Sequence, residues 1–330
     1  MNQNPSSSPG ASPATPGSAL PPAATPQQRR RNSIVGNLSM FAAKTFSGLN
    51  ENALKYLLPT WMNACSGVVL RLGVGSILFW ILGWVRPDRN EKVSMRDRLL
   101  LLLTGMIAVF GYMYTLLVGL TYTTPISSSI FIALQASVVY IICLCLRTER
   151  FTPGRFAGIL LGIAGALVCI LTQKQDDVAS NPLLGNIYCL ISTFLFASYL
   201  VIEKIFLKRL SNATVSKYTF SGGALSAVVM LLISGKWFAP VLTAGVFSTP
   251  FLILAFILFF PSFLSYLLTD VALKRLPATV VALYANWILI VAAIVSYVLG
   301  QDHFSWWQIL SIILIIASVF LVEKAEAKKK

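Results

Sequence analysis

The sequence is poor in the residues on which many enzymes and motors depend. The chain of 330 residues has one histidine, His303, and only 12 Asp and Glu residues. A single histidine argues against a histidine-based metal site and against a Ser-His-Asp triad. The nucleotide-binding pattern G-x-x-x-x-G-K-[ST] is absent, which argues against a motor driven by ATP.

Cysteine is also scarce, and its spacing is not that of a metal site. The five cysteines all fall in apolar stretches, and no two are spaced as C-x-x-C. A cysteine in such surroundings behaves as a small buried hydrophobic residue. The sequence therefore predicts neither a disulfide framework nor a cysteine metal site.

Charged residues make up only 12% of the chain, whereas 56% is hydrophobic. With a mean hydropathy of +0.74, this composition is typical of a polytopic membrane protein and not of a soluble domain. The net charge of +14 could indicate nucleic-acid binding. The placement of the basic residues, described below, argues for a different explanation.

Long apolar runs occupy most of the chain after residue 33. Ten of them are each close to the ~20 residues that span ~30 Å of hydrocarbon as a helix. Short turns separate several of the runs, as in a compact bundle, so we predict an all-α polytopic membrane protein with ten transmembrane helices. The predicted helices are 34–58, 61–85, 99–120, 126–146, 153–171, 184–207, 215–234, 249–272, 278–299 and 305–322.

The distribution of Lys and Arg predicts the orientation of these helices. With the N-terminus in the cytoplasm, most of the 26 basic residues fall on the cytoplasmic side, and Lys174 and Lys236 lie in external loops. This asymmetry follows the positive-inside rule. We therefore predict that both termini are cytoplasmic, and that the basic charge reflects topology and not nucleic-acid binding.

The apolar region is flanked by polar ends. Residues 1–33 are rich in Pro, Ser, Ala, Gly and Gln, which cannot bury a core, so we predict a disordered cytoplasmic tail. Its basic cluster follows polar residues and precedes no cleavage site, unlike a signal peptide. We predict a first five-helix repeat at 34–172, a second at 173–323 and a basic cytoplasmic tail at 324–330.

Short matches relate the two halves. Gly36-Asn37-Leu38 opens the first predicted segment, and Gly185-Asn186-Ile187 opens the sixth. Phe151-Thr152 precedes the fifth segment, as Phe304-Ser305 precedes the tenth. Because each half has an odd number of predicted spans, the two repeats must be inverted in the membrane. Inverted repeats predict a binding site near the midplane and transport by alternating access.

The first apolar segment carries charges that a membrane helix ordinarily excludes. Lys44, Gly48, Glu51 and Lys55 are spaced four, three and four residues apart, so they share one helical face. Charges within a membrane segment usually face a bundle interior or a water-filled cavity. Lys44 lies roughly 15 Å into the segment, where it is predicted either to face a substrate cavity or to form a structural ion pair. Gly48 would leave room beside it.

Glu51 has two interpretations. A carboxyl group in a low-dielectric cavity is easily protonated, which would suit proton coupling. Alternatively, Glu51 is a fixed partner of Lys55 or of Arg71, and a hairpin between the first two segments favours Arg71. Lys55 is itself interpreted as an anchor at the outer membrane interface, with Lys204 as its counterpart at the inner interface.

Uncharged polar side chains in other segments are further candidates. Each amide or hydroxyl buried in hydrocarbon needs a partner, so each indicates either a ligand contact or helix packing, and the aromatic candidates could equally serve packing. Asp270, four residues before Lys274, is interpreted as an exposed pair, and the glycines at 154, 158, 162 and 165 as a packing or dimer stripe. The candidate cavity residues are Lys44, Gly48, Asn50, Tyr112, Ser128, Gln135, Tyr199, Tyr266, Asn286 and Trp287.

An ordered set of short motifs over about residues 34–323 is similar to that of the EamA-like permeases of the drug/metabolite transporter superfamily. Gly48-Leu49-Asn50 followed by Lys55 resembles the family's first-segment motif, and Arg71 resembles its second-segment arginine. Residues 119–123 and 272–276 resemble its A-L-K runs, and residues 148–152 its G-E-x-L-T signature with the glycine replaced. The prolines usual in the family are missing near Ala136 and Leu289, so the resemblance does not determine the shape of the fourth and ninth segments.

The resemblance implies a ten-helix protein of the bacterial inner membrane, with no cofactor and no enzymatic activity. We expect a secondary transporter, an exporter or exchanger, of a small amphipathic or zwitterionic metabolite such as an amino acid. Protons are the candidate coupling ion, with Glu51 and Arg71 as the residues for coupling or pairing, and a homodimer is an open alternative.

Three other functions remain as alternatives. An exchanger of phosphorylated or nucleotide-linked sugars would need two or three cations at the midplane, where Lys44 and Arg71 qualify. An intramembrane lipid-modifying enzyme would need clustered His, Asp or Glu residues. A non-transporting membrane receptor would leave the inverted repeats unexplained.

Overall fold

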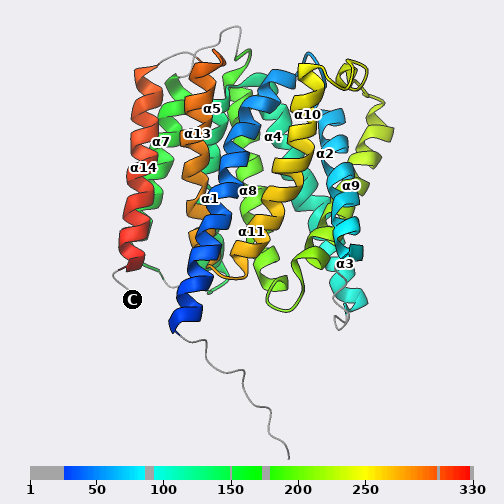
Figure 1. The fold of residues 1–330 in the computed structure, drawn as a ribbon. Coiled ribbons are helices and arrows are strands. Elements are labelled where there is room, and N and C mark those ends of the chain that lie inside the picture. The colour runs from blue at the N-terminus through cyan, green and yellow to red at the C-terminus, as the bar shows by residue number, and fades with distance from the viewer. Residues whose placement is uncertain (1–25, 86–92, 149–150, 173–178, 303–304, 328–330) are drawn as a thin grey trace, which may run out of the picture.

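The computed structural model describes residues 26–85, 93–148, 151–172, 179–302 and 305–327. The regular structure in this part of the chain is helical, and no strand occurs in it. The helices run roughly along one axis and form a single bundle (Figure 1).

The elements fall into two sets that follow the predicted halves. The first set is α1 (Pro26–Leu57), α2 (Ala64–Val85), α3 (Met95–Thr104), the π-helical turn η1 (Gly105–Val109), α4 (Phe110–Tyr122), α5 (Pro125–Ala133), α6 (Gln135–Cys145) and α7 (Pro153–Thr172). The second set is α8 (Pro182–Phe206), α9 (Asn212–Ser234), the 3-10 turn η2 (Pro240–Leu242), α10 (Thr249–Phe259), the π-helical turn η3 (Phe260–Leu264), α11 (Ser265–Leu273), α12 (Ala278–Leu283), α13 (Ala285–Val298) and α14 (Trp306–Ala327).

Seven helical columns in the described residues are long and apolar enough to cross a membrane, so the protein is an integral membrane protein. They are α2, α3–α4, α5–α6, α8, α9, α10–α11 and α12–α13. Each coincides with a predicted segment. The other three predicted segments coincide with α1, α7 and α14, and α1 is the most polar of these because it carries the charged residues singled out above.

The polar ends of the chain are more helical than the composition predicts. Helix α1 begins at Pro26, so residues 26–33 are helical and not disordered, while residues 1–25 lie outside the described part. Proline is favoured at the first helical position, and the Gln and Arg residues that follow are good helix formers. Helix α14 likewise continues through Lys324 to Ala327, and residues 328–330 lie outside the described part.

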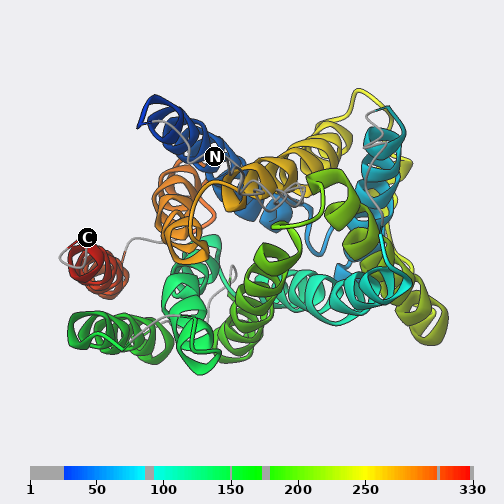
Figure 2. The same ribbon diagram turned by 90° about the horizontal axis from the view of Figure 1, so that it is seen from below.

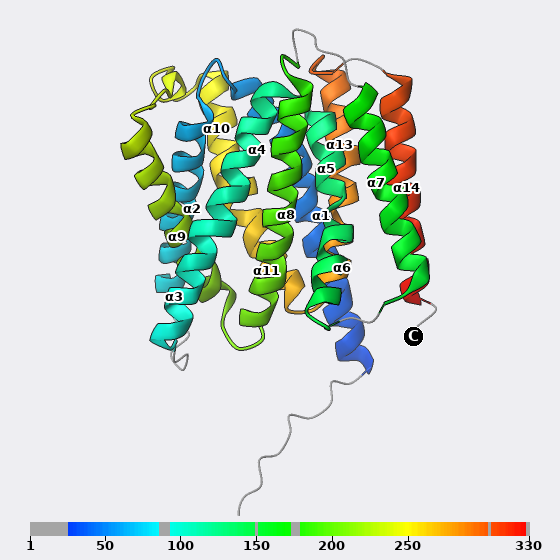
Figure 3. The ribbon, with the colours of Figure 1, turned by 180° about the vertical axis from the view of Figure 1, so that it is seen from behind.

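Matching columns of the two halves run in opposite directions. Helix α1 begins and α14 ends at the same end of the bundle, which we call the basal end (bottom in Figure 1). The α3–α4 column runs away from the basal end, whereas the α10–α11 column runs toward it (Figure 3). Both columns contain a π-helical turn, η1 in the first and η3 in the second.

The fourth and ninth predicted segments are each interrupted by a single residue. Leu134 separates α5 from α6 with φ −67° and ψ −10°, and Tyr284 separates α12 from α13 with φ −64° and ψ −10°. A ψ this far from the helical value near −42° breaks the regular hydrogen-bond ladder. Both segments are therefore broken at the same relative position without a proline.

Helix α9 packs against the α3–α4 column at backbone distance. A Cβ atom added to Gly105 would lie 1.9 Å from the carbonyl oxygen of Thr219, and one added to Gly222 would lie 2.1 Å from that of Leu102. No side chain fits at either distance. Small residues that let backbones approach are typical of helix crossings in membranes.

Helices α7 and α14 lie side by side at one edge of the bundle (Figure 2). Ser311 Oγ donates to the carbonyl oxygen of Gly165 at 2.7 Å, and Ser318 Oγ donates to that of Gly158 at 2.6 Å. The glycine stripe of α7 therefore packs within the chain, against α14.

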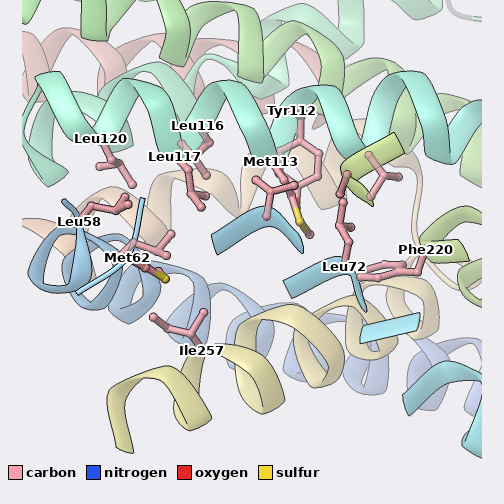
Figure 4. Close-up of a cluster of buried hydrophobic side chains, with 14 of the residues drawn as sticks. Leu58, Met62, Leu72, Tyr112, Met113, Leu116, Leu117, Leu120, Phe220 and Ile257 are labelled. Atoms are coloured by element: carbon pink, nitrogen blue, oxygen red, sulfur yellow. The ribbon is translucent and has the colours of Figure 1, made fainter. Parts of the chain in front are cut away.

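Two clusters of buried apolar side chains occupy the bundle interior at different heights. Along α1, Met40 belongs to the cluster nearer the basal end and Leu54 to the other. The polar stretch from Lys44 to Glu51 lies between them. Figure 4 shows part of the second cluster, with the side chains of Leu58, Met62, Leu72, Tyr112, Met113, Leu116, Leu117, Leu120, Phe220 and Ile257 labelled.

Candidate functional site

A buried cavity of about 70 Å³ lies at the height of this polar stretch. Residues from both halves surround it, and most of its polar side chains are buried. It is lined by Lys44, Ser47, Asn50, Glu51, Arg71, Tyr112, Leu116, Ile132, Gln135, Ser192, Thr193, Phe196, Pro261, Ser265, Tyr266, Thr269 and Ile288.

Lys44 brings a positive charge to the cavity. Its side chain is 3% exposed, and its Nζ lies 5.3 Å from the ring centroid of Phe196. A cation over an aromatic face is stabilised by about 0.5–2 kcal/mol. Within the described part of the chain, no carboxylate forms a salt bridge with Lys44 and no group accepts a hydrogen bond from it. The ammonium group therefore has bonding capacity to spare for a ligand.

Glu51 brings a negative charge to the same cavity. It is 2% exposed. Ser128 Oγ donates to its Oε2 at 2.8 Å, and Asn50 Nδ2 approaches its Oε1 at 3.5 Å. Ser128 does not itself line the cavity, so its part in the site is to hold the carboxylate of Glu51.

Arg71 is the second buried cation, at 3% exposure. Its Nε donates to Ser262 Oγ at 2.9 Å, and its Nη1 has no hydrogen-bond partner among the described residues. Glu51 and Arg71 attract each other electrostatically, yet no salt bridge between them occurs in the described structure. The two charges face one cavity without the direct ion pair that the hairpin geometry favoured.

Lys55 points away from Glu51. Its Nζ donates to the carbonyl oxygens of Leu120 at 3.0 Å and Thr123 at 2.7 Å, at the end of α4. Its counterpart Lys204 donates to the carbonyl oxygens of Leu273 and Leu276 at the end of α11, the latter at 2.7 Å. Both lysines satisfy carbonyl groups that a helix C-terminus leaves unpaired, so each has a capping role in the bundle, and their role as membrane-interface anchors stays a prediction.

Several polar atoms of the cavity-lining residues have no partner. The two polar side-chain atoms of Gln135, Asn50 Oδ1 and Arg71 Nη1 are buried without a hydrogen bond in the described structure. Leaving such an atom unpaired costs about 1–3 kcal/mol. The cavity thus presents both donors and acceptors that a bound molecule could satisfy.

The aromatic candidates separate into two groups. Tyr112 and Tyr266 line the cavity. Tyr199 does not, because its hydroxyl donates to a carboxyl oxygen of Glu203. Gly48 does not line it either: a Cβ atom there would lie 2.6 Å from Val291 Cβ, so Gly48 allows α13 to approach α1.

Asn286 and Trp287 lie on another side of α13. Trp287 Nε1 donates to Thr45 Oγ1 at 2.9 Å, and its ring lies 4.7 Å from that of Phe41. Asn286 Nδ2 donates to the carbonyl oxygen of Leu283. Both residues belong to the new helix that starts after the interruption at Tyr284. These two residues line a separate pocket with Ile290 and Ile316.

The cavity also contains residues that the sequence interpretation missed, among them Ser192, Thr193 and Phe196 of α8 and Ser265 and Thr269 of α11. Together with the predicted Tyr266, the α11 residues line the cavity as the α8 residues do. Both sets have the spacing i, i+1, i+4, which places three side chains on one helical face. Small polar residues at helical spacing within an apolar segment are the signal that would have found them.

A second polar cluster was missed entirely. Asp270 is 0% exposed and accepts a hydrogen bond from Ser216 Oγ, whereas Lys274 is exposed. The interpretation of Asp270 as half of an exposed pair is therefore wrong. Its buried neighbour is Glu203 of α8, at 1% exposure. No group of three or more potential metal ligands occurs in the part of the chain described here.

Comparisons with known proteins agree with this architecture. The EamA-like transporter family matches twice, at residues 34–171 and 183–323. The uncharacterized transporter YyaM of Bacillus subtilis (strain 168) is 23% identical over 275 residues, covering 83% of this chain and 88% of that relative. An uncharacterized transporter of Archaeoglobus fulgidus is 25% identical over 244 residues, covering 74% of this chain and 80% of the relative.

A solved structure supports the fold. A crystal structure covers 92% of this chain and 100% of its own, with a TM-score of 0.64 and 16% sequence identity. At this identity the similarity concerns the fold.

Proposed function

Because the chain belongs to the EamA-like transporter family, we propose that this membrane transporter is a secondary carrier of a small zwitterionic metabolite, such as an amino acid. It would work by alternating access around the central cavity. The observation that carries the proposal is a buried cavity with two cations, one carboxylate and several unpaired amide atoms.

The charges match the two ends of an amino acid. Arg71 Nη1 and Lys44 Nζ have free bonding capacity and would bind the substrate carboxylate, at about 1.5–3 kcal/mol for each charge-assisted hydrogen bond. Glu51, already held by Ser128, would bind the substrate ammonium group. Gln135 offers both a donor and an acceptor to the same polar end.

The aromatic wall would receive the apolar part of the substrate. Tyr112, Phe196 and Tyr266 line the cavity; all three rings offer apolar faces, and the two tyrosines add a hydroxyl group. Ligand pockets in proteins usually measure about 300–1,000 Å³, far more than the 70 Å³ present here. The conformation described is therefore a closed one, and substrate entry requires the helices around the cavity to separate.

Several paired features support inverted repeats. The family matches once in each half, and Lys55 and Lys204 bond equivalent carbonyl groups. Gly36 packs on Leu276 as Gly185 packs on Thr123. With the opposite directions of the α3–α4 and α10–α11 columns, these pairs favour a ten-crossing protein with two inverted repeats. We further propose that both termini are cytoplasmic, as the distribution of Lys and Arg predicts, and that the membrane is a bacterial inner membrane.

A second candidate substrate is a phosphorylated or nucleotide-linked sugar. The observation in its favour is that Lys44 and Arg71 both face the cavity, where they would suit an anionic group. Glu51 in the same cavity repels a second negative charge, so a zwitterion fits the charge distribution better than a phosphate dianion.

Reconstitution tests the proposal. Purified protein in liposomes should exchange labelled amino acids for internal unlabelled ones, and Glu51→Gln should reduce this exchange. Asp97→Asn, which alters a carboxylate outside the cavity, is the matched control and should transport normally. Exchange of sugar phosphates without exchange of any amino acid would replace the first candidate by the second, and equal activity of the two variants would remove Glu51 from the binding site.

A further inference from the structure

Below the cavity, toward the basal end, two acidic side chains from different helices meet in the interior. Glu203 of α8 is 1% exposed and Asp270 of α11 is 0% exposed. Their carboxyl groups lie within hydrogen-bonding reach of each other. Two ionised carboxylates so close in a low-dielectric interior repel each other strongly.

In each of the two carboxyl groups, only one oxygen accepts a hydrogen bond from a hydroxyl group of the described residues. Tyr199 donates to Glu203 Oε1, and Ser216 donates to Asp270 Oδ2. The other oxygen of each carboxyl group, Glu203 Oε2 and Asp270 Oδ1, receives no hydrogen bond from the described residues. An ionised carboxylate only accepts hydrogen bonds, so the two groups can bond each other only if one carries a proton.

The surrounding helices provide little positive charge. Lys274, exposed beyond the end of α11, attracts Asp270 electrostatically. Lys204 is turned away, toward the carbonyl oxygens at the end of α11. The other titratable or polar groups that face the pair are Tyr112 of α4, Tyr199 of α8 and the hydroxyls of Ser216 and Thr219 on α9. Asp97 of α3 pairs with Arg209 at the basal end.

We propose that Glu203 and Asp270 bind one proton between them and form a proton-coupling site separate from Glu51. This proton site deepens the proposed transport function and rests on it, because a bound proton can be coupled to transport only if the protein is a transporter. The proton comes from water at one membrane face and returns to water at the other. No other reactant is needed, because the site gains and loses only that proton.

Tyr199 links this site to the cavity. Its ring lies 5.9 Å from that of Phe196 and 6.4 Å from that of Tyr266, and both of these residues line the cavity. A substrate that separates Phe196 from Tyr266 would also displace Tyr199, the hydroxyl donor to Glu203. The occupancy of the cavity and the proton affinity of the pair are therefore connected through one layer of aromatic side chains.

Tyr112 provides a second connection. It lines the cavity with Arg71 and Glu51. Its ring lies 4.7 Å from that of Phe196, which lies 5.9 Å from the ring of Tyr199, the donor to Glu203. A substrate that moves Tyr112 would therefore also disturb the donor to the carboxyl pair, and protonation of the pair would alter the packing of the cavity wall. By linkage, each of the two binding events then changes the affinity of the other equally.

Infrared spectroscopy tests the proton site without requiring transport. Purified wild-type protein, titrated across pH, should show the carbonyl stretch of a protonated carboxylic acid that shifts on deuterium exchange and disappears at high pH. Glu203→Gln and Asp270→Asn should each remove this band, while Glu51→Gln should leave it. A band that survives both substitutions, or one removed by Glu51→Gln alone, overturns the proposal. If Glu203→Gln fails to fold, Tyr199→Phe replaces it and should shift the pH at which the band disappears.

Transport then tests the coupling. In liposomes, Glu203→Gln and Asp270→Asn should keep substrate exchange and lose accumulation driven by a pH gradient. Accumulation that follows a sodium gradient at constant pH, and that is lost in the same variants, would assign the pair to sodium and overturn the proton assignment. If the infrared band is present but no tested compound is transported, the proposed substrate fails and the proton site stands.

Discussion

The two buried carboxylates of the first helix in each half, Glu51 and Glu203, differ in the charges beside them. Glu51 shares a cavity with Lys44 and Arg71, and Ser128 holds one of its oxygens. Glu203 has Tyr199 on one oxygen and a second carboxyl group, that of Asp270, within reach. Burial alone is the same at both places, at 2% and 1% exposure.

This difference separates two uses of a buried acid. Cations beside a buried carboxyl group favour its ionised form, which can bind the positive end of a substrate, whereas a second carboxyl group beside the first disfavours that form. One interior can therefore hold both a substrate site and a proton site, provided that the cations are confined to the first.

Removing Arg71 should have the largest effect, because Arg71 is part of what distinguishes the two sites. Arg71→Met should weaken amino-acid binding at least about 30-fold, since truncating one member of a buried charge pair costs about 2–5 kcal/mol. Arg71→Lys keeps the charge and should retain part of the affinity. Binding is measured by substrate protection against thermal unfolding. Equal affinity in the wild type and Arg71→Met would contradict the role of Arg71.

Removing Lys44 should have a smaller effect on the same site. Lys44→Met should reduce affinity about tenfold, because one charge-assisted hydrogen bond is worth about 1.5–3 kcal/mol. Lys44→Arg is the matched control. The loss should be smaller for an amine that lacks the carboxylate than for the amino acid, as measured by competition for uptake. A uniform loss for both compounds would indicate a packing role instead.

The two halves differ at Glu51 and Glu203, but they are alike at the two lysines that cap helix ends. Lys55→Met and Lys204→Met should each destabilise the protein by about 1–3 kcal/mol, since each leaves buried carbonyl groups unpaired. Thermal unfolding in detergent should show similar losses for the two, and substitution of an exposed lysine just beyond the end of the helix that carries Lys204, Lys208→Met, should change little. Stability unchanged in both variants would show that the carbonyl groups find other donors.

The smallest effect is expected at the edge of the bundle. Arg209 and Asp97 form a salt bridge of 2.8 Å, with 57% and 12% of their side chains exposed. Solvent-exposed pairs contribute about 0–1 kcal/mol. Asp97→Asn should therefore shift the unfolding temperature by at most a few degrees, and less at high salt. A loss as large as that of Lys55→Met would mean that this pair is buried in the membrane-embedded protein.

The charged part of the cavity could be predicted because hydrocarbon leaves few alternatives. Lys44, Glu51 and Arg71 occur in segments that must cross a membrane, so each had to face the interior. That argument determines which way each charged side chain points, but it does not determine which residues the side chain contacts. Direct pairing of Glu51 with Arg71 was expected, and the structure instead places both on the cavity wall.

The carboxyl pair could not be predicted because its members looked like edge residues. Asp270 precedes Lys274 by one helical turn, which suggested local pairing near the membrane surface, and Glu203 was not singled out at all. In the structure Asp270 is buried, and the two acids meet across two helices distant in sequence. Local spacing carries no information on a contact of this kind.

Asn286 and Trp287 show a different limit. Their mid-segment position indicated a cavity role, but they lie on the new helix that starts after the interruption at Tyr284 and line another pocket. Where a helix is broken, a residue's face can no longer be counted from the start of the segment. The missing proline near Leu289 left the shape of this segment undetermined, and nothing in the sequence located the interruption at Tyr284.

The contact of Gly105 with Thr219 and of Gly222 with Leu102 has a mechanical consequence. Ordinary helix pairs slide or rock by repacking the layer of side chains between them, and at these two contacts that layer is missing. We therefore expect helix α9 and the α3–α4 column to move together, although they belong to different halves. In the proposed transport cycle the hinge would then lie elsewhere in the bundle, so the moving parts would not coincide with the two proposed repeats.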